Sequence, residues 1–110
     1  MKTKLFISLS IAFLFSSLAA GGDNIQQTKF KASGNCEMCE NRIEKAVKVK
    51  DVKFASWDKK TKMLTVAFNS KTVTADSLQK LIASAGHDTE KYKAPDAVYS
   101  ALPECCLYRK

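Results

Sequence analysis

Cys36 and Cys39 are separated by Glu37 and Met38, and this pair is the part of the chain best suited to chemistry. It follows a short strand-like run and precedes an amphipathic helical pattern, so both thiols stand at the beginning of an expected helix. The positive end of the helix dipole lowers the pKa of a thiol placed there and favours the thiolate. Thiolates bind soft metal ions in preference to hard ones. The spacing therefore predicts that Cys36 and Cys39 close on one soft metal ion.

Other chemistries use two cysteines at this spacing, and the neighbouring residues bear on each. In an oxidising compartment Cys36 and Cys39 could form a small disulfide. A thioredoxin-like site usually has an aromatic residue before the first cysteine, where this chain has Asn35. A haem-attachment site needs histidine after the second cysteine, where Glu40 stands. A thiol-disulfide redox protein and a disulfide-stapled interaction module remain as alternatives to metal binding.

Cys105 and Cys106 form a second sulfur pair near the C-terminus. A disulfide between adjacent cysteines closes a very small, strained ring. The two thiols could instead add ligands to the first pair, bridge to it, or have no part in it. An expected strand leads away from the first pair for roughly 23 Å. A short helix returns roughly 12 Å, and four extended residues add at most about 14 Å. By these estimates the tail is just long enough to return to Cys36 and Cys39. Cys105 and Cys106 are therefore candidate additional metal ligands.

The pattern of apolar residues predicts four strands and two main helices. The expected strands are 28–32, 52–57, 63–68 and a weaker one at 87–93. The expected helices are 37–48 and 75–85, with a short third helix at 95–102. This order gives an α+β fold, a ferredoxin-like βαββαβ sandwich with two helices on a four-stranded antiparallel sheet and a short C-terminal extension.

In that topology the fourth strand lies beside the first, so His87 should lie near the loop that carries Cys36. His87 is therefore a candidate additional ligand, although a lone histidine is more often an ordinary surface residue. Met38 offers another soft sulfur between the two thiols. Its position on the helix favours an outward-facing side chain instead.

From Thr28 to Lys93 the chain resembles the heavy-metal-associated domain of copper chaperones, metal-pumping ATPase N-termini and periplasmic mercury-binding proteins. The resemblance rests on four features: Cys36-x-x-Cys39, the hairpin 52–68, Val73-Thr74 before the second helix and Ala85-Gly86-His87 after it. It implies one metal ion held by both thiolates and passed to a partner by ligand exchange. Some bacterial copper chaperones of this type have histidine at the position of His87, where it can join the metal.

One departure from the family concerns the loop before the first cysteine. The usual loop has methionine two residues before that cysteine, buried as an anchor, and this chain has Gly34 there. The loop should therefore be looser, or anchored by another residue. The metal preference of the family does not carry over directly for the same reason.

The N-terminal segment has the pattern of a secretory signal peptide. Lys2 and Lys4 precede an apolar run at 5–18, and small residues follow it. A retained membrane anchor is the alternative, although the run is short for a membrane span. We expect a signal peptide at 1–20, a heavy-metal-associated domain at 27–93 and a tail at 94–110 with the adjacent cysteines. The protein would then be exported, periplasmic or extracytoplasmic, and its mature form would not span the membrane.

Charge and composition narrow the function further. The formal net charge is +7, so lysines could dock an acidic partner, although most surface lysines are simply solvated. No aromatic-basic platform for nucleic acid is present. The chain has one histidine and no evident nucleophile–base pair, so we expect no enzyme. The sequence predicts a metallochaperone or scavenger for Cu(I), with Hg(II) or Zn(II) as further candidates. Its expected partner is a metal-transporting or metal-accepting protein.

Overall fold

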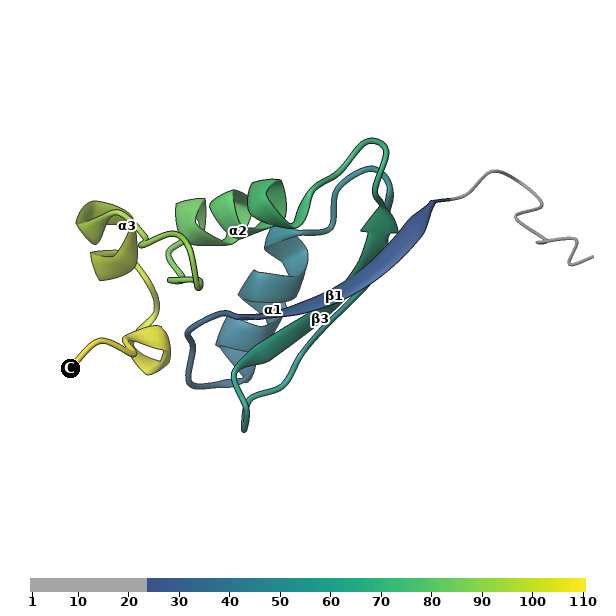
Figure 1. Ribbon diagram of the computed structural model, residues 1–110. Coiled ribbons are helices and arrows are strands. Elements are labelled where there is room, and N and C mark those ends of the chain that lie inside the picture. The colour runs from purple at the N-terminus through teal and green to yellow at the C-terminus, as the bar shows by residue number, and fades with distance from the viewer. Residues whose placement is uncertain (1–23) are drawn as a thin grey trace, which may run out of the picture.

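A three-stranded antiparallel sheet carries two helices on one face (Figure 1). The computed structural model describes residues 24–110, so the predicted signal peptide lies outside the described residues. The strands are β1 (Ile25–Lys31), β2 (Val52–Trp57) and β3 (Met63–Asn69). The helices are α1 (Glu37–Ala46), α2 (Ala75–Ser84), the short α3 (Asp96–Ser100) and the 3-10 turn η1 (Glu104–Cys106).

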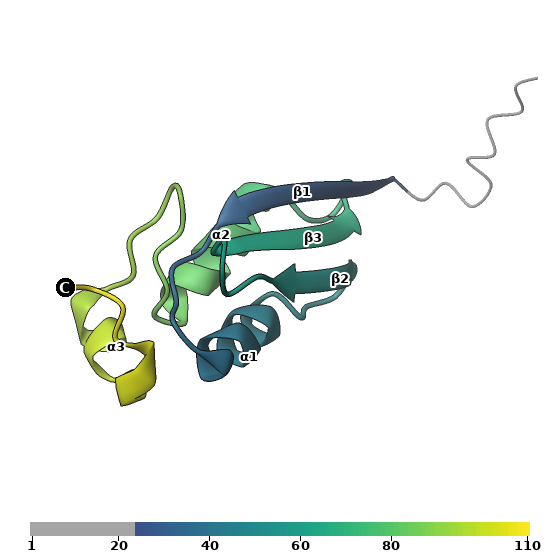
Figure 2. The same ribbon diagram turned by 90° about the horizontal axis from the view of Figure 1, so that it is seen from below.

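The central strand is β3, which pairs with both of its neighbours in the order β1-β3-β2 (Figure 2). Its alternation places Leu64, Val66 and Phe68 on the buried face, as the sequence predicts. The turn between β2 and β3 closes when Lys62 N–H donates to Asp58 O at 2.7 Å. Lys62 adopts a left-handed backbone there, with φ of 65°.

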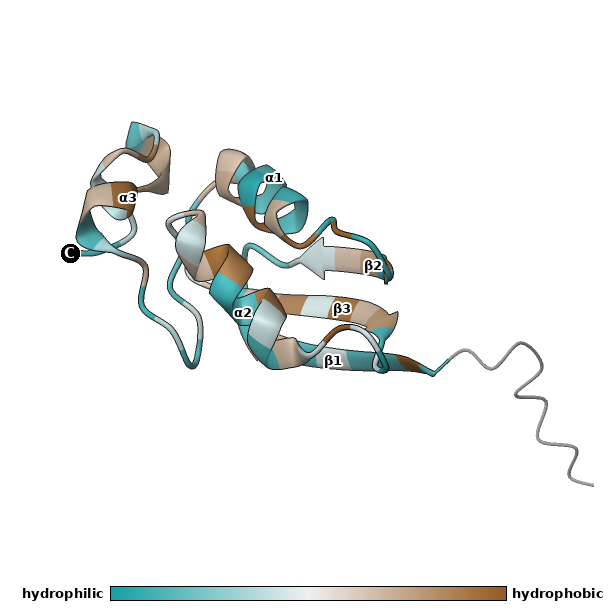
Figure 3. Ribbon diagram, turned by 90° about the horizontal axis from the view of Figure 1, so that it is seen from above, coloured by the Kyte–Doolittle hydropathy of each residue, from teal (hydrophilic) through white to brown (hydrophobic). Residues whose placement is uncertain are grey.

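Helices α1 and α2 lie side by side over the sheet (Figure 3). In α1, Cys39 and Ile43 are buried one turn apart, and Val47 continues the same stripe just after the helix. In α2, Leu78 and Ile82 are buried.

Two end contacts fix the helices. Thr74 caps α2 by accepting a hydrogen bond from Ser77 N–H at 3.0 Å, and Ser77 Oγ accepts one from Thr74 N–H in return. Arg42 of α1 donates to the carbonyl of Ala85 at the end of α2, at 3.1 Å. Within the described residues, no helix is both long enough and apolar enough to cross a membrane.

The predicted fourth strand is wrong, because residues 87–93 form a turn instead. Thr89 makes one isolated bridge with Ala32. Thr89 N–H donates to Tyr92 O at 2.8 Å, and Tyr92 N–H donates to the Thr89 hydroxyl at 3.1 Å, so the segment closes on itself. The Glu90 carboxylate accepts from Lys31 N–H at 2.9 Å, where a fourth strand would have offered a backbone carbonyl. The sheet of the described chain therefore has three strands.

After this turn the tail, residues 94–110, stays at one end of the sheet (Figure 2). Of its two short helical turns, α3 and η1, the second packs against α1. Tail residues Leu102 and Cys106 are buried and belong to the same apolar core as Cys39. The C-terminal end of the chain thus reaches the place where α1 begins.

Candidate metal site

Three sulfur atoms meet where α1 begins. Cys36 Sγ lies 3.4 Å from Cys39 Sγ and 3.6 Å from Cys106 Sγ, and all three lie within 4.8 Å of one another. Cys39 and Cys106 are fully buried, whereas Cys36 is partly exposed. The four cysteines are free thiols. A set of three soft donors fits a soft metal ion, and solvent reaches it through Cys36.

The start of α1 positions the first two thiols. Cys36 is the N-cap residue, and its side chain makes no capping hydrogen bond to the helix. A serine or aspartate here would direct its oxygen to the helix backbone, whereas the Cys36 sulfur remains available to the other thiols. Cys39 lies one turn along and faces the core, and its sulfur accepts a hydrogen bond from Asn35 N–H at 3.3 Å.

Trp57 occupies the space beside Gly34 and anchors the loop. A Cβ on Gly34 would lie 2.8 Å from Cys39 Cβ and 3.1 Å from Trp57 Cη2, so only glycine fits without displacement. Trp57 is 3% exposed, and its Nε1–H donates to Ala32 O at 2.9 Å. The expected alternative anchor is therefore an indole from the end of β2. The sequence analysis did not identify Trp57 as this anchor.

Cys105 lies beside the three-sulfur group but is not a member of it. It is exposed, and its thiol lies 3.6 Å from the sulfur of Met38. Met38 is 52% exposed, in line with the outward orientation expected from its place on the helix. Of the two adjacent tail cysteines, the structure brings Cys106 into the group and leaves Cys105 at the surface.

His87 is fully buried, so the expectation of an ordinary surface histidine is wrong. Its Nδ1 lies 2.8 Å from Ser33 O, close to the cysteine loop. The ring stacks on Tyr108 with centroids 5.8 Å apart, and Nε2 has no hydrogen-bond partner among the described residues. Burial lowers the pKa of His87 and favours the neutral ring. His87 is not a member of the three-sulfur group.

Mutual hydrogen bonds lower the pKa of Cys36 and raise the pKa values of Cys105 and Cys106. Burial raises the pKa of Cys36, but hydrogen bonds from Cys105, Cys39 and Cys106 outweigh burial and lower that pKa to about 7. The hydrogen bond to Cys36 raises the pKa of Cys105. Burial raises the pKa of Cys106, as do its hydrogen bonds to Cys39 and Cys36. Near neutral pH the thiolate therefore forms at the accessible Cys36 before it forms at Cys105 or Cys106.

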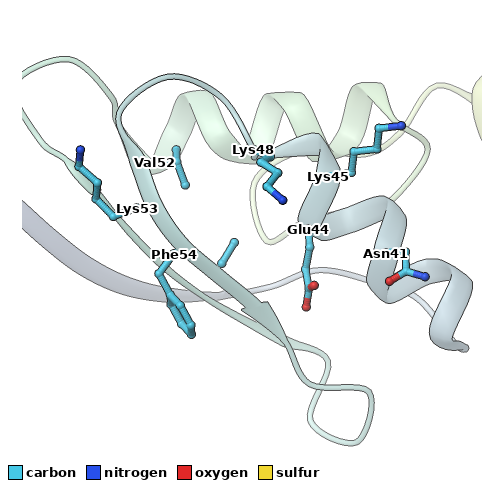
Figure 4. A pocket seen from close by; sticks show the side chains of 8 residues that line it. Asn41, Glu44, Lys45, Lys48, Val52, Lys53 and Phe54 are labelled. Atoms are coloured by element: carbon cyan, nitrogen blue, oxygen red, sulfur yellow. The ribbon is translucent and has the colours of Figure 1, made fainter.

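A second concave feature lies away from the sulfurs, between α1 and β2 (Figure 4). This groove of about 530 Å³ has Lys45 and Lys48 on its helix side and Lys53 and Phe54 on its strand side. Phe54 is 52% exposed. The lining has three lysines against one acid, Glu44, together with apolar side chains, so the groove is mainly basic and partly apolar.

Comparison with known proteins gives matches among solved structures alone: no protein-family model and no curated protein matches this chain. Oxidised MerP from Ralstonia metallidurans CH34 is 25% identical with a TM-score of 0.56, over 60% of this chain and 94% of its own. The N-terminal domain of a potential copper-translocating P-type ATPase from Bacillus subtilis, solved in its Cu(I)-loaded state, is 27% identical with a TM-score of 0.56. That match covers 59% of this chain and 84% of the ATPase domain.

A third match is to the structure named CopZ metallochaperone, with a TM-score of 0.56 over 58% of this chain and 98% of its own. At 20% identity it shows the fold alone. Together the sheet, the two covering helices and these likenesses show that this chain contains a heavy-metal-associated-like domain.

Proposed function

We propose that this protein is an exported metallochaperone or scavenger that binds Cu(I) through the thiolates of Cys36 and Cys39. The observation that carries the proposal is the 3.4 Å approach of these two sulfurs at the start of α1, with Cys36 open to solvent. The Cu(I)-loaded state of one similar ATPase domain supports the choice of metal. Hg(II) and Zn(II) are the further ions that such thiolates accept.

The two cysteines would play different parts in uptake. Cys36 is partly exposed and its pKa is about 7, so near neutral pH it offers a thiolate to an incoming ion. Cys39 is buried beside Cys36 and would supply the second ligand from the core side of the ion. Each thiol that binds the ion as thiolate releases its proton to solvent. Delivery would run in reverse, as a thiolate of the acceptor displaces Cys36 from the accessible side.

The acceptor would be a metal-transporting or metal-accepting protein with an acidic docking face. Lys45, Lys48 and Lys53 line the groove between α1 and β2, next to the helix that begins at the metal site. Complementary charge of this kind raises the rate of encounter more than the final affinity. The N-terminal signal-like sequence supports an extracytoplasmic location.

The test is Cu(I) affinity of the reduced, metal-free protein, measured by competition with a Cu(I)-selective chelator. Cys36→Ser and Cys39→Ser should each weaken binding by orders of magnitude, because one thiolate is lost from the pair. Cys105→Ser is the matched control, since that thiol is exposed and outside the three-sulfur group, and a serine hydroxyl can still donate a hydrogen bond to Cys36. A Cys36→Ser/Cys39→Ser double variant that binds Cu(I) as tightly as the original chain would contradict the proposal.

A thiol-disulfide redox role is the second candidate, because the low-pKa thiol of Cys36 lies 3.4 Å from a second thiol. Oxidation would join Cys36 and Cys39 and remove both from metal binding. A disulfide reductase assay on the metal-free protein, beside the Cu(I) titration, separates the two. Catalytic turnover without tight Cu(I) binding would favour the redox role.

A further inference from the structure

We propose that Cys106 is a third metal ligand and that the tail is a built part of the metal site, so that Cu(I) is held by three sulfurs. The proposal rests on the proposed function and specifies its coordination. Cys106 Sγ lies 3.6 Å from Cys36 Sγ, almost as close as Cys39 Sγ does at 3.4 Å. The three sulfurs thus form one compact group although 70 residues separate Cys36 from Cys106.

A buried cysteine is often only a small apolar core residue. The different orientation of the adjacent Cys105 argues against that interpretation for Cys106. Cys105 and Cys106 are adjacent in the chain, yet η1 turns Cys106 inward, fully buried, and leaves Cys105 exposed. The turn is fixed when Cys106 N–H donates to Pro103 O at 2.8 Å. The inward sulfur meets the two sulfurs of the metal-binding pair instead of an aliphatic side chain alone.

An apolar contact holds the tail just before η1. Leu102 is 6% exposed and packs directly on the backbone of Gly86 at the end of α2. A Cβ on Gly86 would lie 2.8 Å from Leu102 Cδ2, so a side chain at residue 86 would push the tail away. Gly86 also has a positive φ of 109°, which favours glycine.

A polar network holds the tail just after η1. The Tyr108 hydroxyl donates to Gly86 O at 2.7 Å and accepts from Asp88 N–H at 2.8 Å. Arg109 grips both oxygens of Asp88, with Nη2 at 2.7 Å from Oδ1 and Nε at 3.3 Å from Oδ2. Arg109 Nη2 also donates to Ala94 O at 2.7 Å. Contacts on both sides of Cys106 offset the entropy lost when the tail is ordered.

The number of sulfur ligands favours Cu(I) over a structural zinc ion. The three-sulfur group holds no fourth histidine, cysteine or carboxylate ligand among the described residues. A structural zinc site usually needs four protein ligands, whereas Cu(I) accepts three thiolates. A third thiolate from a second segment also shields the ion, so release to an acceptor requires the tail to give up its ligand. Such a site suits storage or controlled release better than rapid exchange.

The experiment is X-ray absorption spectroscopy of the full chain, reduced and loaded with one equivalent of Cu(I). The original chain should show three sulfur neighbours. Cys106→Ser should show two, with shorter Cu–S distances, and should bind Cu(I) more weakly while remaining loaded. Cys105→Ser is the matched control, one residue away, and should keep three. Cys106→Ala gives a second variant without a buried hydroxyl, and thermal unfolding of each variant reports whether the domain remains folded.

The outcomes separate this proposal from the function on which it rests. Two sulfur neighbours in the original chain, unchanged in Cys106→Ser, would overturn the third ligand and leave Cu(I) binding by Cys36 and Cys39 standing. Three neighbours in Cys106→Ser and in Cys106→Ala alike would also overturn it. Failure of the original chain to bind Cu(I) would overturn both proposals.

Discussion

Gly34 is the residue on which the shape of the cysteine loop depends most directly. It lies between the Cβ of Cys39 and the ring of Trp57, with no room for a side chain on either side. The loop thus combines the smallest residue at position 34 with the largest one at position 57. Together they set the direction in which Cys39 points, and hence the spacing of the sulfurs.

Gly34→Ala should therefore destabilise the protein and weaken metal binding together. The added methyl would lie 2.8 Å from Cys39 Cβ, so the loop must shift, and overpacking of this kind costs roughly 1–3 kcal/mol. Urea unfolding of the metal-free protein measures the stability, and chelator competition measures Cu(I) affinity. Unchanged values in both measurements would show that the loop has room for a larger residue at position 34 than its contacts indicate.

Among the elements, α1 positions the sulfur ligands and α2 supports the tail. Helix α1 carries two of the sulfurs and packs against η1, which carries the third. Helix α2 supplies apolar contacts over the sheet and ends just before Gly86, against which Leu102 of the tail packs. Its capping box at Thr74 and Ser77 is at the opposite end from that contact.

Thr74→Ala should lower stability without changing metal affinity. The alanine cannot accept the hydrogen bond that Ser77 N–H donates to the Thr74 hydroxyl, and loss of such a cap costs about 1 kcal/mol. Thr74→Ser keeps the hydroxyl and should remain close to the original chain. Thermal unfolding and Cu(I) competition on both variants check this expectation. A marked loss of affinity in Thr74→Ala would show that the site depends on the far end of α2.

For the whole molecule, Asp88 links the domain to its tail. Burial raises the pKa of this carboxyl, but hydrogen bonds from Arg109 and Ala94 outweigh burial and hold the pKa below its ordinary value of 3.8. A carboxyl with a lowered folded-state pKa stabilises the fold above its unfolded-state pKa. That contribution is lost as the pH falls through the folded-state pKa.

Asp88→Asn should therefore lower the thermal midpoint at neutral pH, because Arg109 loses the less exposed of its two charged partners. The difference from the original chain should be constant from pH 7 down to about 4 and should shrink below that, as Asp88 itself is protonated. Asp96→Asn is the control, since its carboxylate also pairs with Arg109 but is 90% exposed. A difference that stays the same well below pH 4 would mean that Asp88 acts through packing and not through its charge.

The sequence by itself determined the elements whose signal is local. Periodic apolar residues predicted α1, α2 and the hairpin of β2 and β3. The bounds of β2 are confirmed, and each of the other three ends one or two residues away from its predicted last residue. The Cys36–Cys39 spacing before a helical pattern predicted two neighbouring thiols at a helix start, which the structure shows. These predictions succeed because residues that share a turn or a strand face are placed by backbone geometry alone.

The tertiary structure decided what depended on distant partners. Residues 87–93 turn back on themselves because the Thr89 and Glu90 side chains take up backbone hydrogen bonds that a strand would use. In α2, Leu81 is 38% exposed whereas the polar Gln79 is buried, a distribution that the packing of the helix against the rest of the fold decides. Nothing local distinguishes Cys105 from Cys106. Which of the two thiols turns inward follows from where Leu102, Tyr108 and Arg109 attach the tail, and those contacts exist only once the domain has folded.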